Sequence, residues 1–343
     1  MFLVVLLLLG AGCSAEQVDT SRDGGIFKSV DGGRTWTQTT AVPSTKGVGN
    51  IASLNLLTIA FDPSDHEAVY VGSQENGLFF SYDGGAAWQR PRGAPFEKEA
   101  VRSIAVDSAH MCTSYAVAGA RLYKSENCSR TYTSAYYETR ANVSVRRVTV
   151  DWYDSNVVYL GLSNGDVLKS TDQAQSWTKV LTTKEEINQI FVSNADSRIL
   201  LVGSSQGLYR STDGGATWTS EEGALKAFRD ANDVFSLVQN ASGDTILMAT
   251  QYGLLRSTDI GQTWQTLKLV TSPGQVVVRA LAIHPSDPKT IYYATSSALY
   301  ASLDGGETWQ TYKLPSSRAA AFLRIDPVKP EVLYLGVIRL ENN

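Results

Sequence analysis

The chain has 343 residues, of which 43% are hydrophobic and 19% are charged, an ordinary composition for a globular protein that gives no sign of disorder. The formal net charge of -4 gives no global reason to expect binding to nucleic acid or to an anionic membrane surface. We therefore expect no nucleic-acid partner.

The N-terminal segment, residues 1–13, is predicted to be a targeting signal and is excluded from fold reasoning. Its apolar run is too short to span a bilayer, which takes about 20 residues. The sequence Leu-Gly-Ala-Gly-Cys at residues 9–13 resembles a bacterial lipoprotein cleavage site, which implies a lipid on Cys13. The alternative is an ordinary secretory signal cleaved near Ala15. Either route exports the protein, with residues 14–23 as a polar spacer and, in the first case, a lipid anchor at the cell membrane or envelope.

A pattern of the form Ser-x-Asp-x-Gly-x-Thr-Trp dominates the rest of the chain. Seven versions occur, and six of the seven tryptophans lie in them. The residues at the Asp position are Asp31, Asp83, Asn127, Asp172, Asp213, Asp259 and Asp304, at intervals of 52, 44, 45, 41, 46 and 45 residues. A period near 45 residues is typical of propeller blades or a solenoid.

The repeats predict short strands along the chain. Residues 25–29 and 35–38 form half a unit, and the next unit is complete, with strands at 57–61, 68–72, 78–81 and 87–90. Comparable units follow at 101–134, 145–180, 187–220, 233–267 and 277–312, and residues 320–325 and 332–337 supply two more strands.

The two incomplete ends complement each other. Two strands from each end complete a seventh blade and remove the exposed sheet edges. The sequence therefore predicts an all-β fold: one seven-bladed β-propeller of four-stranded blades over residues 24–338, closed by N- and C-terminal half-blades, with a tail at 339–343. A single propeller replaces the two domains that length alone suggests.

The repeated turns are predicted to be structural. An Asp in a tight turn accepts hydrogen bonds from the backbone N–H groups after it, and the glycines supply positive φ. Calcium ligands or catalytic acids are the alternative, but equivalent positions around a ring cannot share one active site. We assign no catalytic residue, and the scattered histidines and cysteines show no metal-ligand spacing, so no metal or other cofactor is expected. The structural aspartates are Asp31, Asp83, Asp172, Asp213, Asp259 and Asp304.

The turn at residues 125–132 departs from the pattern, with Asn127-Cys128-Ser129 in place of Asp-Gly-Gly. Cys128 lies in this turn, and Cys112 falls near the connection between the first two strands of the same unit, at the same face of a blade. We hypothesise a disulfide between Cys112 and Cys128 that substitutes for the missing Asp-Gly-Gly chemistry. Export to an oxidising compartment agrees with this pairing.

The repeats at residues 24–36 and 207–215 resemble the Asp-box, or bacterial neuraminidase repeat. This repeat is shared by sialidases, xyloglucan-hydrolase propellers, sortilin-type receptors and photosystem II stability and assembly factors. The residues of these two repeats are most similar to those of the last group. The resemblance implies the propeller fold and says little about function. The Arg-Ile-Pro element of sialidases is absent, and no carboxylate pair for glycoside hydrolysis is evident, so an enzyme is not expected.

An arginine opens the first strand of three units at the same offset: Arg102, Arg146 and Arg279. We expect these side chains around one mouth of the central channel, at the face opposite the Asp turns, where guanidinium groups can bind carboxylates or phosphates. The alternative is that such arginines are solvated or paired with Glu97, Glu99, Glu138 or Asp230. Connecting loops at the same face add candidate partner-binding residues, namely Arg92, Tyr136, Tyr137, Arg140 and Arg147.

These features favour a non-catalytic, extracytoplasmic binding or assembly scaffold, expected to be a monomer, that docks a protein partner at the arginine-bearing face. The resemblance implies a membrane-protein assembly intermediate of the photosystem as the partner in a phototroph, and a surface protein or a glycan otherwise. The competing interpretation is a glycan-binding or glycan-hydrolysing propeller of the sialidase or xyloglucanase kind.

Overall fold

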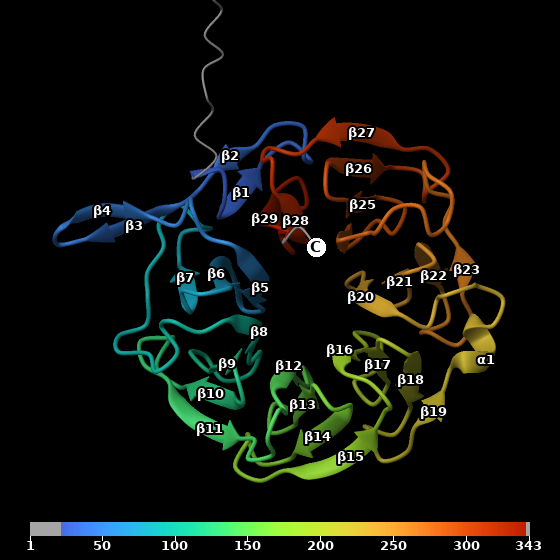
Figure 1. Cartoon of the computed structure of the whole chain (residues 1–343), viewed down its shortest axis with the longest axis horizontal. Helices are drawn as coiled ribbons and strands as arrows, with labels where there is room; N and C mark the ends of the chain where they lie inside the picture. The colour runs from blue at the N-terminus through green and yellow to red at the C-terminus, as the bar shows by residue number, and fades with distance from the viewer. Residues whose placement is uncertain (1–21, 341–343) are drawn as a thin grey trace, which may run out of the picture.

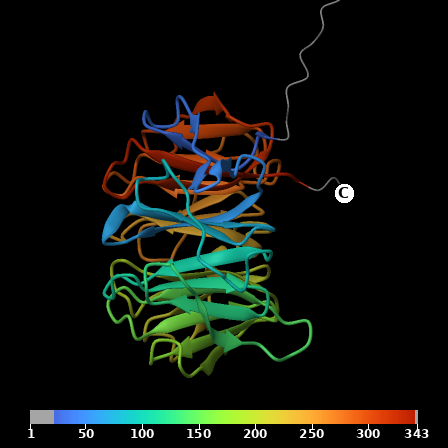
Figure 2. The same cartoon turned by 90° about the vertical axis from the view of Figure 1, so that its left-hand side faces the viewer.

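The computed structural model describes residues 22–340; the expected signal with Cys13 and most of the spacer and tail lie outside the described residues. Seven blades surround one axis, as seen down that axis in Figure 1 and edge-on in Figure 2. Within these residues there is one helix, the single-turn α1 (Glu222–Leu225). It is not long and apolar enough to cross a membrane. The predicted all-β, seven-bladed propeller is confirmed.

Six blades follow one another along the chain, each running from an inner strand at the channel to an outer strand at the rim. Blade 1 contains β5 (Leu56–Asp62), β6 (Asp65–Ser73) and β7 (Leu78–Ser81). Blade 2 contains β8 (Val101–Val106), β9 (Ser114–Ala118), β10 (Arg121–Ser125) and β11 (Thr133–Tyr137). Blade 3 contains β12 (Val145–Val150), β13 (Val158–Leu162), β14 (Asp166–Ser170) and β15 (Thr178–Thr182). Blade 4 contains β16 (Ile187–Val192), β17 (Leu200–Ser204), β18 (Gly207–Ser211) and β19 (Thr219–Ser220). Blade 5 contains β20 (Val234–Gln239), β21 (Ile246–Thr250), β22 (Leu254–Ser257) and β23 (Gln265–Thr266). Blade 6 contains β24 (Ala280–Ile283), β25 (Ile291–Ala294), β26 (Ala298–Ser302) and β27 (Gln310–Lys313).

Blade 7 joins the two ends of the chain, as predicted. Its strands, from the channel outward, are β28 (Ala319–Ile325), β29 (Leu333–Ile338), β1 (Ile26–Ser29) and β2 (Thr37–Gln38). The seam is the antiparallel pairing of β1 with β29, in which Ile26 lies opposite Gly336. This pairing closes the ring, so the ends of the chain leave no open sheet edge between them.

The prediction of an outer strand at residues 87–90 in blade 1 is wrong. Only an isolated bridge between Phe80 and Gln89 remains. The reason lies in Trp88, whose backbone N–H donates to the Ala41 carbonyl at 2.8 Å and whose indole N–H donates to the Thr39 carbonyl at 2.8 Å. The segment therefore divides its hydrogen bonds between its own blade and the chain that leaves blade 7.

The chain leaving blade 7 forms a hairpin that the sequence did not predict. Strands β3 (Ala41–Ser44) and β4 (Gly47–Asn50) pair only with each other, and the hairpin projects from the rim in Figure 1. Its outer half is exposed, whereas Ile51 at its base is buried between blades 7 and 1. The hairpin thus occupies the long interval between the first two repeats.

The hydrophobic core is divided into seven clusters of buried side chains, one at each interface between neighbouring blades. Because every blade is covered on both faces, all five residues of β13 and of β17 are buried. Glycine allows close approach here: a Cβ on Gly161 would lie 2.6 Å from Ile187 Cγ2, and one on Gly203 would lie 2.6 Å from Val234 Cγ1. The neighbouring inner strand takes the room that a side chain would need.

The repeated Asp turns bond mainly to themselves. In blade 4, Asp213 Oδ1 accepts the Thr217 backbone N–H at 2.8 Å, and Oδ2 accepts the Thr217 hydroxyl at 2.6 Å. The Ser211 hydroxyl donates to Asp213 Oδ1 and accepts the Gly215 N–H, both at 2.8 Å. The bonds from Thr217 and Ser211 lower the pKa of Asp213 to about 2. No group of His, Cys, Asp or Glu within residues 22–340 is arranged to hold a metal ion.

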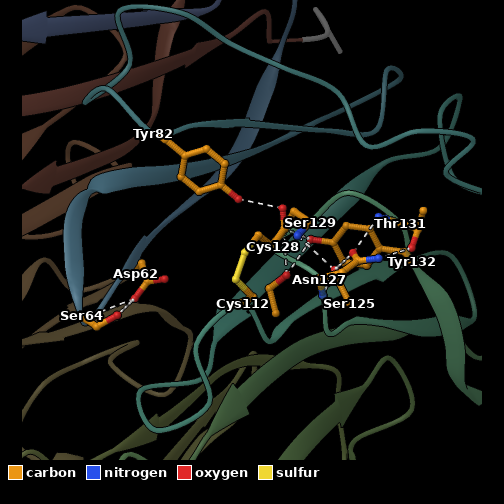
Figure 3. Close-up of a disulfide and its surroundings, with 11 residues drawn as sticks. Asp62, Ser64, Tyr82, Cys112, Ser125, Asn127, Cys128, Ser129, Thr131 and Tyr132 are labelled. Atoms are coloured by element: carbon orange, nitrogen blue, oxygen red, sulfur yellow. Dashed lines mark hydrogen bonds between the residues drawn. A yellow bond between two sulfur atoms is a disulfide. The ribbon is translucent and has the colours of Figure 1, made fainter.

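The divergent turn of blade 2 keeps this hydrogen bonding (Figure 3). Asn127 Oδ1 accepts the Thr131 N–H at 3.0 Å, and the Asn127 amide donates to the Thr131 hydroxyl at 2.7 Å. The expectation that the turn chemistry is missing is therefore wrong, since Asn127 takes the place of the aspartate. What changes is the glycine pair: Cys128 and Ser129 each adopt φ of 56°, and a disulfide joins Cys128 to Cys112.

Basic side chains link five of the seven turns to the preceding blade, a feature that the sequence pattern did not predict. Lys169 Nζ of blade 3 donates to the Gly214 carbonyl of blade 4 at 2.7 Å, and the Tyr159 hydroxyl donates to the same carbonyl at 3.0 Å. The residue before the repeated serine is also basic in four other blades. Lys28, Arg210 and Arg256 donate to the backbone carbonyls of Gly84, Ile260 and Gly305, respectively. Lys124 donates to the side-chain carbonyl of Gln173. The turns therefore hold neighbouring blades together.

Candidate functional site

The inner strands share a local irregularity that positions the channel side chains. The antiparallel register shifts near the start of β5, β8, β12, β16, β20 and β28, so one residue of each is left without a partner. A β-bulge of this kind redirects the side chain of the extra residue. The residues at the shift are Leu57, Arg102, Arg146, Asn188, Phe235 and Ala321. In blade 6, Arg279 occupies the residue just before β24, and its N–H donates to the Ala294 carbonyl.

The channel has a cavity of about 380 Å³ lined by the inner strands. Arg102 and Arg279 both line it, at the end where the inner strands begin, so the topology puts them at the face opposite the Asp turns. In the described part of the chain, neither guanidinium makes a hydrogen bond or an ion pair. Burial and the nearby charge of Arg146 lower the pKa of Arg102. Arg102 and Arg279 are thus cations open to a ligand.

Arg146 differs from the two arginines with which it was grouped. Its Nε donates to Glu186 Oε2 at 3.0 Å, and its terminal nitrogen contacts the same oxygen. Glu186 lies in the loop before β16 of the next blade, and Arg146 is not among the residues that line the cavity. The ion-paired alternative considered for these arginines therefore describes Arg146, with Glu186 in place of the four acidic residues that the sequence suggested.

Two further arginines line the cavity. Arg147 of β12 donates from Nε to the Asn188 carbonyl and from Nη1 to the carbonyls of Arg102 and Arg146 at 3.3 and 3.1 Å. Burial, followed by the charges of Arg146 and Arg102, lowers its pKa to about 10. Arg324 of β28, which the sequence-based account missed, has Nη1 bonded to the Leu323 carbonyl at 3.0 Å, and burial lowers its pKa.

The remaining candidates lie away from this cavity. Tyr136 and Arg140 both contact Glu138: the tyrosine hydroxyl donates at 2.8 Å, and the guanidinium donates at 2.9 and 2.8 Å. Arg140 also donates to Asp166 Oδ2 at 2.6 Å, and its hydrogen bonds hold the pKa of Glu138 at about 2. Tyr137 is covered on one side by the Arg121 guanidinium, 3.8 Å from its ring centroid.

Arg92 is exposed in the loop between blades 1 and 2, and its backbone N–H bonds to the Arg130 carbonyl. Neither Arg92 nor the Tyr136–Arg140 group lines the channel cavity. The structure therefore brings Arg102, Arg147 and Arg279 together and leaves Arg92, Tyr136, Tyr137 and Arg140 apart from them.

Acidic groups suited to hydrolysis are not found in the channel. None of the residues that line the cavity is Asp or Glu. Asp107, Asp151 and Asp326, which follow the inner strands, each accept backbone N–H groups in their own turns. His110 Nδ1 lies 3.0 Å from Asp107 Oδ2 and 2.9 Å from Ser155 Oγ, but a Ser-His-Asp relay needs both ring nitrogens.

Comparison with known proteins agrees with the resemblance inferred from the repeats. Residues 172–314 match the model of the family described as "Photosynthesis system II assembly factor YCF48". A xyloglucanase from Paenibacillus sp. is 29% identical over 203 residues, which make up 59% of this chain and 13% of that protein. A probable oligoxyloglucan-reducing end-specific xyloglucanase from Neosartorya fischeri is 32% identical over 78 residues, 22% of this chain and 9% of that protein. The chain therefore spans only a small part of these relatives.

Solved structures share the fold at low sequence identity. The GH74 xyloglucanase from Xanthomonas campestris matches with a TM-score of 0.68 and 18% identity, covering 83% of this chain and 51% of that one. YCF48 from Cyanidioschyzon merolae matches with a TM-score of 0.65 and 14% identity, covering 87% and 98%. YCF48 bound to D1 peptide matches with a TM-score of 0.63 and 16% identity, covering 87% and 95%. At these identities the likeness supports the propeller fold alone.

Proposed function

We propose that this protein is a non-catalytic binding scaffold that docks a carboxylate-bearing segment of a protein partner at the arginine-bearing face. The observation that carries the proposal is the pair Arg102 and Arg279, whose guanidinium groups lack a counter-ion among the described residues and line a cavity without Asp or Glu. Guanidinium binds carboxylate through paired, charge-assisted hydrogen bonds. One propeller of similar fold, YCF48, has been solved bound to D1 peptide, and this supports peptide docking as the mode here.

The proposal extends to the cellular location. The lipoprotein-like sequence ending at Cys13 and the disulfide between Cys112 and Cys128 both suit an extracytoplasmic protein held at a membrane. A protein held at the membrane in this way can contact a membrane protein, or an assembly intermediate of one, and we propose such a protein as the partner. In a phototroph we expect this partner to be a photosystem intermediate.

Glycan hydrolysis is the second candidate, because xyloglucanases are among the relatives of this chain. Such chemistry needs two carboxyl groups set across a glycosidic bond. The channel cavity supplies four arginines and no carboxylate, which favours anion binding over this reaction.

The test is recovery of the partner by crosslinking and purification from membranes of the source cells. We expect a specific protein with the unaltered chain and its loss with the double variant Arg102→Gln/Arg279→Gln. The matched control is Arg34→Gln/Arg130→Gln, which removes two exposed arginines from the Asp turns at the opposite face.

Equal recovery from both double variants contradicts docking at the arginine-bearing face. Reproducible cleavage of xyloglucan or of another glycan in a panel contradicts the non-catalytic assignment. Binding that weakens as salt rises is expected for a complex held by exposed charges.

A further inference from the structure

Arg324 stands apart from the arginines at the channel mouth. It lies three residues beyond the bulge residue Ala321 on β28, and at about 3.3 Å per residue this places it about 10 Å further along the channel. It also lines a second cavity of about 340 Å³, formed where β20, β24 and β28 end. Arg324 is therefore accessible from the channel and from the face that carries the Asp turns.

The hydrogen bonding of Arg324 is incomplete. An arginine has five N–H donors, and the hydrogen bond that its guanidinium makes within residues 22–340 runs from Nη1 to the adjacent Leu323 carbonyl at 3.0 Å. A half-buried cation with so few partners is costly unless an anion or water completes its shell.

The cavities beside Arg324 are lined without acidic side chains. Neither the channel cavity nor the second cavity has Asp or Glu among its lining residues. Asp326, two residues away, is bonded to His66 Nδ1 at 2.9 Å and to the N–H groups of its own turn. Arg147, which shares the channel cavity, adds a second positive charge whose donors are bonded to neutral carbonyl groups.

We propose that Arg324 anchors a binding site for a small oxyanion inside the channel, with Arg147 as its electrostatic support. The ligand class is a free phosphate, sulfate or carboxylate ion, held by the unused guanidinium donors in paired hydrogen bonds. This site lies about 10 Å along the same channel from the mouth formed by Arg102 and Arg279, and it stands whether or not a protein partner docks there.

The experiment uses the full chain in an amine buffer with chloride at constant ionic strength. Inorganic phosphate, sulfate and formate are titrated separately by calorimetry, and the melting temperature is followed in parallel. We expect saturable binding with Kd on the order of 1 mM for phosphate or sulfate, and weaker binding for the singly charged formate. Linear, non-saturating heats for all three ions overturn the proposal.

Variants locate the site. Arg324→Gln is expected to weaken phosphate binding at least about 10-fold, the loss of about 1.4 kcal/mol. Arg34→Gln, the exposed control, is expected to bind phosphate as the unaltered chain does, and Arg102→Gln/Arg279→Gln, the mouth variant, is expected to retain the saturable binding that Arg324→Gln removes. Binding that survives Arg324→Gln but disappears with the mouth variant overturns the proposal.

Folding of Arg324→Gln is checked by its melting temperature without added anion, and Arg324→Lys keeps the charge as a second test. Crystals of the unaltered chain soaked in selenate give an independent answer, because selenium scatters anomalously. We expect an anomalous peak within hydrogen-bonding distance of Arg324. Peaks confined to the molecular surface mean an adventitious ion only and overturn the site.

Discussion

Removal of one turn hydroxyl tests the structural role of the repeat. Ser211 is 2% exposed, and its hydroxyl accepts the buried Gly215 N–H at 2.8 Å while donating to Asp213 at 2.8 Å. The variant Ser211→Ala leaves that N–H without an acceptor, which costs about 1–3 kcal/mol. We expect a loss of about 2 kcal/mol in the free energy of unfolding and a fall of about 3 °C in melting temperature for a chain of this length.

The assay is urea unfolding followed by tryptophan fluorescence, with calorimetry of the same samples. Thr212→Ala is the matched control, since the neighbouring side chain is exposed and makes no hydrogen bond in the described structure. We expect the control to lie within about 0.5 kcal/mol of the unaltered protein. A Ser211→Ala variant as stable as Thr212→Ala would refute the structural role of the turn.

Three other predictions concern the same turns. Lys169→Met removes a charged hydrogen bond to the next blade and should lower stability by about 1.5 kcal/mol in urea unfolding, with the unaltered chain as reference. In a Lys124→Met background, where the cross-blade hydrogen bond to the Gln173 side chain is already lost, Gln173→Gly should raise stability by about 1 kcal/mol, because residue 173 has φ of 57°, a conformation that is costly for residues other than glycine; an unchanged melting temperature relative to Lys124→Met contradicts this. In acid, the turns around Asp31, Asp172 and Asp213 should weaken: each pKa falls from 3.8 to about 2 on folding, so the stabilisation is complete above pH 4 and is lost as pH falls through 2. A urea midpoint that stays constant from pH 5 to pH 2 contradicts the acid prediction.

The sequence was sufficient for the blade count and the closure of the ring. A turn of fixed composition recurs once per blade, so its spacing alone reveals the period and the two half-units at the ends. The β3–β4 hairpin escaped prediction because residues 41–50 contain a proline and two glycines and show no alternation of apolar side chains. The hairpin lies between Asp31 and Asp83 and accounts for the long first interval.

The candidate site was predicted only in part, because its contacts cross between blades. Arg102 and Arg146 occupy the repeated bulge, and Arg279 is the residue just before β24, so the sequence shows them at one periodic position. The partner of Arg146, Glu186, lies 40 residues away in the next blade, and no local pattern marks it. Arg324 lies within an otherwise apolar strand. A single charged residue in a predicted inner strand was the feature of the sequence that could have identified it as a channel residue.

Hydrogen–deuterium exchange on the complex with the recovered partner tests the central claim most directly, because it reports both faces of the propeller at once. We predict protection at the amides around Arg102, Arg146 and Arg279, where the inner strands begin, and unchanged exchange in the Asp turns around Thr212 and Thr263. Protection confined to the Asp turns, with none where the inner strands begin, would contradict the assignment of the arginine-bearing face as the docking surface.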